Sequence, residues 1–191
     1  MGVEEMMAEH VCPVWLGYIL ASPLRKLSQN PQKILEPYVE KGMTALDVGC
    51  AMGFFSLPLA ELVGPDGKVI CVDLQEKMVR SLDRRGRRAG LGDRIETHVC
   101  RKDSLGLDHV REEVDFALLF AVVHEVPDPP RLFSEIHRML KPGGRALVVE
   151  PRGYVSSKRF ETSVSIAAQN GFEVAQRPEI RRARAALLSK E

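Results

Sequence analysis

The fold of this chain is decided by the stretch Thr44-Ala-Leu-Asp-Val-Gly-Cys-Ala-Met-Gly53. It joins a short apolar run, an aspartate and a loop of small residues to a segment that opens as a helix at Phe54. This order of strand, tight turn and helix start is the one on which α/β proteins bind nucleotide-like ligands. Small residues at positions 49, 51 and 53 let the backbone approach a ligand, and the first N–H groups of the helix point toward it.

Apolar runs alternate with helix-like segments along the rest of the chain. Five strand-helix units in a row predict a doubly wound parallel sheet with helices on both faces. The link between the last two strands is too short for a helical crossover, so this closing pair is expected to be antiparallel. Strands are predicted at residues 45–48, 68–73, 94–100, 114–123, 145–150, 172–176 and 183–188, and helices at 54–63, 75–89, 127–140 and 157–170, the third helix ending in a turn at 141–144.

Length and composition set the broad class of the protein. A chain of 191 residues suits one domain, which we divide into a helical prefix (1–40) and an α/β core (41–191). With 27 basic and 26 acidic residues the net charge is +1, so a dedicated nucleic-acid binder is not expected. Four cysteines without C-x-x-C spacing, no secretory signal and no run long enough to span a bilayer predict a cytoplasmic protein with reduced thiols.

Two common phosphate-binding motifs do not fit the loop. A dinucleotide fingerprint, G-x-G-x-x-G, would need a glycine where Phe54 stands, and the glycine falls one residue early, at Gly53. A phosphate loop would need Gly-Lys-Ser or Gly-Lys-Thr, which the loop lacks. The arrangement that remains is Asp-x-Gly-x-Gly-x-Gly, with Ala51 in place of the middle glycine.

In this arrangement the chain resembles the class I S-adenosylmethionine-dependent methyltransferases, from about residue 30 to its end. Asp73 stands 20 residues beyond Gly53, where that family carries the acid that binds the ribose hydroxyls. Leu118-Leu-Phe-Ala-Val-Val-His-Glu-Val-Pro-Asp128 is similar to its fourth strand and following loop, and Leu140-Lys-Pro-Gly-Gly-Arg-Ala-Leu-Val-Val149 to its turn into strand five. Within this family, the chain most resembles the small-molecule, methyltransferase type 11-like branch, which includes quinone-biosynthesis C-methyltransferases. The resemblance implies a Rossmann-like fold with a seven-stranded sheet, and methyltransferase activity.

The resemblance also implies the residues that bind the cofactor, S-adenosylmethionine, and its product S-adenosylhomocysteine. Asp73 would accept hydrogen bonds from the two ribose hydroxyls, and Asp47 would either attract the ammonium group or orient the loop. At the adenine, strand alignment favours Cys100 and Arg101, whereas counting back from the next strand favours Asp103, and the choice stays open. The predicted set is Asp47, Gly49, Cys50, Ala51, Gly53, Asp73, Leu74, Cys100, Arg101, Phe120 and Ala121, with no metal site.

His124, at the mouth of the fourth strand, is the candidate general base for the acceptor's proton. The alternative is a histidine at a helix start that contacts backbone or solvent. Glu150 and Arg152 could line the acceptor pocket. The apolar residues 120–123 suit a small, partly apolar acceptor.

Two other functions and one structural role are weighed against this interpretation. The chain could bind the cofactor without catalysis, as a regulator or partner subunit, or it could methylate RNA through the basic helix 75–89. A solvated helix face explains those basic residues more simply. Trp15 and Tyr18 in the prefix could close the site as a lid, with a homodimer contact or packing on the sheet as the alternatives.

Overall fold

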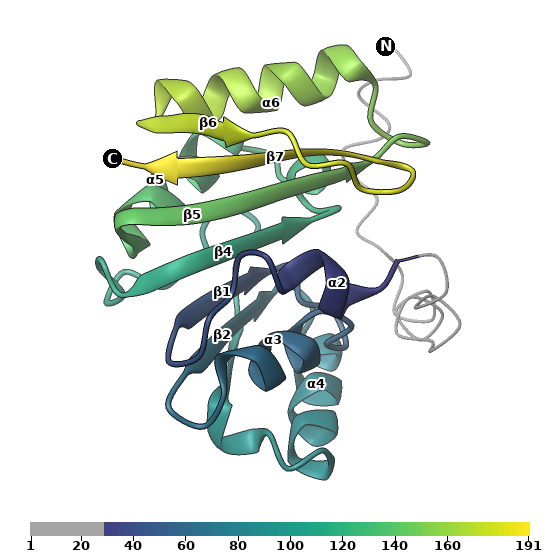
Figure 1. Cartoon of the computed structure of the whole chain (residues 1–191), viewed down its shortest axis with the longest axis vertical. Coiled ribbons are helices and arrows are strands. Elements are labelled where there is room, and N and C mark those ends of the chain that lie inside the picture. Colours follow the sequence, from purple (N-terminus) through teal and green to yellow (C-terminus); the bar gives the residue numbers. More distant parts are fainter. Residues whose placement is uncertain (1–28) are drawn as a thin grey trace.

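The computed structural model describes residues 29–191, which form a seven-stranded sheet in the order β3-β2-β1-β4-β5-β7-β6 (Figure 1). Strands β1 to β5 run parallel, and β7 is antiparallel to both of its neighbours, β5 and β6. The predicted architecture is therefore confirmed. The strands are β1 (Thr44–Val48), β2 (Lys68–Asp73), β3 (Ile95–Val99), β4 (Val114–Phe120), β5 (Leu140–Pro151), β6 (Phe172–Gln176) and β7 (Ala183–Lys190).

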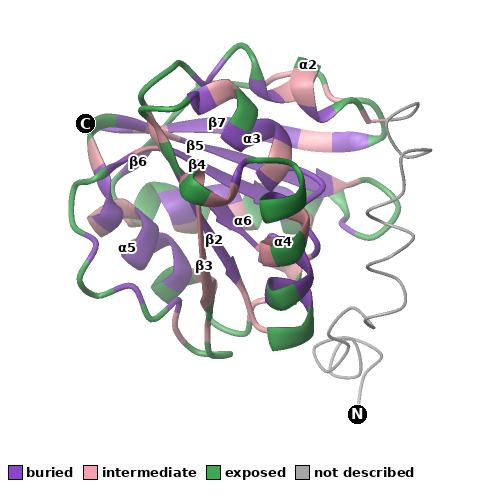
Figure 2. Ribbon diagram, turned by 90° about the horizontal axis from the view of Figure 1, so that it is seen from below, coloured by how far each residue is buried: buried purple, intermediate pink, exposed green. Residues whose placement is uncertain are grey.

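Helices cover both faces of the sheet, and the strands between them are largely buried (Figure 2). Successive strand side chains point to opposite faces, so Ala45 packs in one apolar cluster while Leu46 packs in the other. The first cluster includes residues of α2, α3 and α4, and the second includes residues of α5 and α6. The helices are α2 (Pro31–Leu35), α3 (Ser56–Val63), α4 (Glu76–Arg88), α5 (Pro129–Met139) and α6 (Ser157–Gln169), with 3-10 turns η3 (Gly92–Arg94) and η4 (Val123–Glu125).

Strand β4 is shorter than the sequence predicts. It ends at Phe120 because Ala121 adopts a left-handed conformation, with φ of 57°, which turns the chain out of the sheet. The N–H of Ala121 still donates to the carbonyl of Val149 at 2.7 Å, and η4 follows at once. As a result His124 stands in a tight turn above the strand ends rather than at the end of a longer strand.

Strand β5 is longer than predicted, because the expected turn at 141–144 lies inside it. The strand begins at Leu140, directly after α5, and its pairing with β4 shifts between Val114 and Phe116. Gly143, with φ of 76°, permits this irregularity. The preceding helix is correspondingly shorter, since α5 begins at Pro129 behind an N-cap in which Asp128 accepts from the N–H of Arg131.

The strand order reverses between β1 and β4, and this places a ligand crevice above their carboxyl ends. The loops that leave β1, β2, β4 and β5 meet there. Among the described residues no helix is long and apolar enough to cross a membrane. The predicted lid residues, Trp15 and Tyr18, lie outside the described residues.

Candidate functional site

The loop after β1 requires glycine at two positions because of the protein around it. Gly49 and Gly53 have φ of 73° and 85°, which side chains rarely tolerate. A Cβ at Gly49 would lie 2.8 Å from Cγ2 of Val122, and one at Gly53 would overlap the side chain of Leu82 in α4. The two glycines therefore let the loop pack tightly against Val122, the residue before η4, and against Leu82 of α4. They also leave the loop backbone free of side chains toward the crevice.

The middle position of the loop carries backbone strain. Ala51 has φ of 46°, in the left-handed region that costs an L-residue roughly 1–2 kcal/mol. Its N–H donates to Oδ2 of Asp73 at 2.9 Å, which holds the strained residue in place. Strain of this kind persists where surrounding contacts over-determine the backbone, as they commonly do at ligand sites.

We expect Ala51→Gly to raise the free energy of unfolding by about 0.5–1 kcal/mol, because relief of the strain exceeds the added entropy of the unfolded glycine. Urea denaturation measures this difference in the free energy of unfolding, provided that its slope against urea concentration is the same in both proteins. Ala168→Gly, at an exposed position in α6, is the matched control and should lower stability by a similar amount. Equal destabilisation by both substitutions would contradict the strain at Ala51.

Asp73 joins the loop to the end of β2. Its two oxygens accept hydrogen bonds from the N–H groups of Ala51 (2.9 Å) and Gln75 (2.8 Å), so the carboxylate lies between the loop and the start of α4. Burial raises the pKa of Asp73, against the opposing effect of the N–H donors of Gln75, Ala51 and Leu74. Each carboxylate oxygen retains further lone pairs. Asp73 can therefore accept hydrogen bonds from a pair of neighbouring hydroxyl groups.

Asp47 lies beneath the loop rather than in the crevice. It is only 3% exposed, and its Oδ2 accepts a hydrogen bond of 2.6 Å from Oγ of Ser56, the first residue of α3. Burial raises its pKa to about 7, while the Ser56 hydrogen bond lowers it and the charge of Asp73 raises it. A nearby ammonium group would favour the charged form of such a carboxyl. Ser56 is a partner that the sequence analysis missed.

One of the basic residues of α4 contacts the loop. Arg85 is half-buried and its Nη1 donates to the carbonyl of Met52. The prediction that the basic residues of this helix form a solvated face is therefore wrong for Arg85. The prediction holds for Arg80 and Arg87, which form exposed ion pairs with Glu76 and Asp83 one helical turn away.

Four further residues of the predicted cofactor-binding set would contact the cofactor through their backbone rather than their side chains. The side chains of Cys50 and Phe120 are buried, at 4% and 9% exposed, and pack in the cluster on the α3 face. Leu74 contributes its N–H to Asp73. Ala121 stands where the chain leaves β4, at the edge of the crevice.

The segment after β3 is held by a residue that the sequence analysis did not identify. Arg101 and Ser104 pair across a tight turn, which leaves Arg101 and Asp103 exposed and Cys100 half-buried. Glu135 of α5 accepts from Oγ of Ser104 (2.8 Å) and from the N–H of Leu105 (2.7 Å). Its only sequence signal is an acidic residue on the buried side of an amphipathic helix. The Cys100–Arg101 and Asp103 alternatives both stay predictions.

His124 and Glu150 form a hydrogen-bonded pair above the ends of β4 and β5, in which only the glutamate is fully buried. Nδ1 of His124 lies 2.6 Å from Oε2 of Glu150, and the backbone N–H of His124 donates to Oε1 at 3.1 Å. Glu150 is 1% exposed, whereas the histidine side chain is 18% exposed. A carboxylate is an acceptor, so Nδ1 carries the proton and Nε2 is the nitrogen left for proton transfer.

The surroundings of His124 favour its charged form. Burial lowers the pKa of the imidazole, but the hydrogen bond and charge of Glu150 outweigh it, so the pKa lies above its ordinary value. Glu125 raises the pKa further, and Arg159, which donates to the carbonyl of His124 at 2.9 Å, lowers it. The pair is thus a base that becomes available as pH rises, oriented by a fixed carboxylate.

Similarity to known proteins agrees with this geometry. Residues 39–180 match the protein family described as a methyltransferase domain. The chain is 31% identical to a demethylmenaquinone methyltransferase from Geobacillus kaustophilus over 112 residues. These residues make up 59% of this chain and 47% of that relative. The chain spans about half the length of the curated relatives it matches.

Solved structures extend the similarity to almost the whole chain. A SAM-dependent methyltransferase from Aquifex aeolicus superposes with a TM-score of 0.83 at 25% identity, covering 94% of this chain and 98% of that one. A geranyl diphosphate C-methyltransferase from Streptomyces coelicolor, solved with S-adenosyl-L-homocysteine, shares the fold, with a TM-score of 0.67 at 17% identity over 84% of this chain and 74% of that one.

Proposed function

Because this chain belongs to the class I S-adenosylmethionine-dependent methyltransferases, we propose that it transfers a methyl group from S-adenosylmethionine to a small-molecule acceptor and releases S-adenosylhomocysteine. The observation that carries the proposal is the contact between the Gly49–Gly53 loop and Asp73, which joins two neighbouring strand ends. It brings an acceptor-only carboxylate beside a tightly folded glycine loop.

The residues present fit the cofactor chemically. Asp73 accepts hydrogen bonds from the ribose hydroxyls, and the loop offers backbone rather than side chains to the rest of the molecule. Asp47, buried below the loop with a pKa of about 7, gains a favourable partner in the ammonium group. This electrostatic role fits its buried position better than direct contact, and Ser56 holds its carboxyl in place.

The chemistry asks little of the protein beyond alignment and proton transfer. When bound, S-adenosylmethionine supplies a methyl group activated by its sulfonium; the sulfur–carbon bond breaks as the acceptor's bond to the methyl forms. Nε2 of His124 takes the proton that the acceptor loses, and Glu150 orients the ring through Nδ1.

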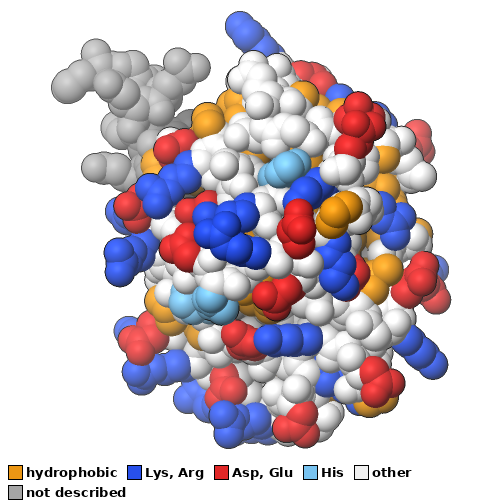
Figure 3. Space-filling view, turned by 90° about the vertical axis from the view of Figure 1, so that its left-hand side faces the viewer, with side chains coloured by type: hydrophobic (Ala, Val, Ile, Leu, Met, Phe, Trp, Pro, Cys, Tyr) orange, Lys and Arg blue, Asp and Glu red, His pale blue; other side chains and the backbone are white. Residues whose placement is uncertain are grey.

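A small molecule is the acceptor that the observations support best. Curated relatives from Geobacillus kaustophilus and Lactobacillus johnsonii are named for demethylmenaquinone, a small molecule. An RNA acceptor receives less support, because exposed ion pairs neutralise part of the basic α4. On the face seen in Figure 3, basic and acidic side chains are interspersed rather than gathered by sign.

Two experiments test the function. Calorimetry with S-adenosylmethionine, S-adenosylhomocysteine and NAD should show binding of the first two alone. Labelled methyl donor, incubated with the protein and a cell extract that is then separated into small-molecule, RNA and protein fractions, should label the small molecules. Label in the RNA fraction would favour the RNA methyltransferase. Tight cofactor binding with no label in any fraction would favour a non-catalytic regulator.

A further inference from the structure

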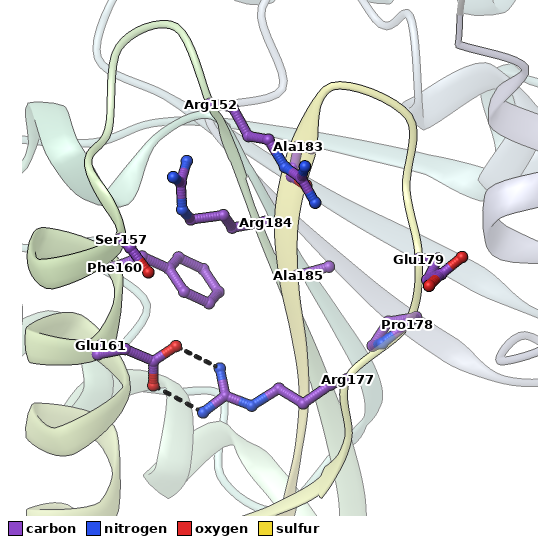
Figure 4. Close-up of a pocket in the computed structure, with 10 residues that line it drawn as sticks. All are labelled: Arg152, Ser157, Phe160, Glu161, Arg177, Pro178, Glu179, Ala183, Arg184 and Ala185. Carbon is purple, nitrogen blue, oxygen red and sulfur yellow. Dashed lines mark hydrogen bonds and ion pairs between the residues drawn. The ribbon is translucent and has the colours of Figure 1, made fainter.

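A cavity lies between α6 and the link from β6 to β7 (Figure 4). It has a volume of about 400 Å³ and three arginines in its walls, Arg152, Arg177 and Arg184. Figure 4 shows Arg152 and Arg184 toward one end of the cavity and Arg177 at the other, with the ring of Phe160 between them. Phe160 is 2% exposed, and its packed ring forms an apolar part of the cavity wall.

The three arginines differ in how their charge is balanced. Arg177 forms a two-pronged ion pair with Glu161, at 3.0 and 2.8 Å, which closes its end of the cavity (Figure 4). Within residues 29–191 no carboxylate forms an ion pair with Arg152 or Arg184. Glu179 also lines the cavity, and Figure 4 shows its carboxylate directed away from these two guanidinium groups. Arg152 and Arg184 are therefore two cations of the cavity wall without an ion-pair partner in the described part of the chain.

Backbone contacts hold both of these guanidinium groups in position. Nε of Arg152 donates to the carbonyl of Ala183 at 3.0 Å, and Nη1 of Arg184 donates to the carbonyl of Val155 at 2.8 Å. A guanidinium has five N–H donors, so each keeps several for a ligand. Planar forks of this kind match the oxygens of carboxylates and phosphates. Ser157, the first residue of α6, adds a hydroxyl to the wall.

The cavity adjoins the proposed base through the strand ladder. Arg184 of β7 is paired with Glu150 of β5, so both side chains project from the same face of the sheet. Arg152 follows Glu150 by two residues and donates its N–H to the carbonyl of Arg182 at 3.0 Å. Arg182, which directly precedes Ala183 of the cavity wall, has φ of 58° and is a strained residue.

We propose that this cavity binds an anionic group, a carboxylate or a phosphate, of the methyl acceptor, through Arg152 and Arg184. The proposal rests on the proposed function and narrows its substrate class: the acceptor is a small molecule with an apolar part at the methyl site and a negatively charged group that reaches Arg152 and Arg184. Arg177 stays paired with Glu161 and sets the far boundary of the subsite.

Binding of simple anions tests the subsite without any enzymatic reaction. Inorganic phosphate and succinate are titrated separately by NMR, which distinguishes the two anion types. We expect Arg152→Gln and Arg184→Gln each to weaken binding of the preferred anion by about ten-fold, the loss of one charge-assisted hydrogen bond. Glu161→Gln, which releases Arg177, should strengthen binding. Arg181→Gln, an exposed arginine of the same link, is the matched control and should leave it unchanged.

Arg184→Lys keeps the charge, and thermal unfolding of every variant reports whether the fold is retained. Equal loss in Arg181→Gln and Arg152→Gln would overturn the proposal, since any positive charge would then serve. So would unchanged binding in folded Arg152→Gln and Arg184→Gln.

Methyl transfer tests whether the subsite serves the acceptor. The labelled small-molecule fraction of a cell extract is passed over an anion exchanger, and the labelled product should be retained. In a second measurement, Arg152→Gln should raise the KM for the small-molecule fraction, while the calorimetric affinity for S-adenosylmethionine stays unchanged. A labelled product that is not retained would overturn the anionic acceptor while leaving the methyltransferase intact. No label in any fraction, with the anion titrations as expected, would instead contradict the proposed function.

Discussion

Replacing Asp73 with alanine is expected to weaken S-adenosylmethionine binding by at least about 100-fold. The carboxylate would lose hydrogen bonds to two hydroxyls, each worth about 1.5–3 kcal/mol to a charged acceptor, and about 3 kcal/mol corresponds to a factor on the order of 100. Calorimetry with S-adenosylhomocysteine should show the same loss, because the ribose is common to both. Asp73→Glu, which keeps the charge but moves it by one methylene, should bind with intermediate affinity.

The structure supplies a matched control for this substitution. Asp115 of β4 also accepts from a backbone N–H, that of Thr44 at 2.8 Å, and contacts Lys141, but at the opposite end of the strands. Both alanine variants leave backbone N–H groups without their acceptors, which costs about 1–3 kcal/mol of stability. Asp115→Ala should show that loss with cofactor affinity unchanged. Retained affinity in a folded Asp73→Ala protein would show that the ligand is held elsewhere.

Replacing His124 with asparagine is expected to lower kcat by about 10²–10⁴-fold, the range that a general base contributes. Asparagine can still donate to Glu150, so the buried carboxylate keeps a partner, but no basic nitrogen remains. Affinity for S-adenosylmethionine should be unchanged. His109→Ala removes an exposed histidine and should leave kcat as it is. Unchanged kcat in His124→Asn would remove the histidine from the mechanism.

The pH profile separates the roles of His124 and Glu150. A raised pKa means that the neutral base forms only as pH rises above the ordinary range of histidine, so kcat/KM should rise with pH through a value above 6.5. Glu150→Gln removes the largest influence that raises this pKa, while burial and Arg159 still lower it. The rise should therefore move to lower pH, with a reduced maximum because the ring is less well oriented. A profile that does not move would limit Glu150 to a structural role.

Features that depend on neighbouring residues could be predicted from the sequence. The loop of small residues after a short apolar run placed the β1–α3 turn correctly, and Asp73 was correctly placed at the end of β2. Its contact with the loop is a finding of the structure, and its role at the ribose stays a prediction. The antiparallel closing strand followed from the short link before it. Errors occurred where a conformation depends on distant partners, as in residues 121–123, which read as strand but turn away at Ala121.

The partners of the site residues could not be predicted in the same way. Glu150 lies 26 residues from His124, and Glu135 lies 31 from Ser104, so neither pairing leaves a spacing signal. Arg85 belongs to a run of basic residues that look alike in sequence, and only the approach of α4 to the loop selects it.

The sheet, the glycine loop and the aspartate at the end of β2 could be predicted from local sequence, because apolar periodicity, glycine and strand ends report local backbone preference and burial. Three contacts became visible only in the folded chain: His124 bonds to Glu150, Ser56 donates to Asp47, and Arg152 and Arg184 line one cavity. Those contacts depend on strand order and register, which bring residues from separate β-α units to one edge of the sheet. A hydrogen bond requires atoms within about 3 Å, and no property of the separate segments specifies that distance before the sheet has formed.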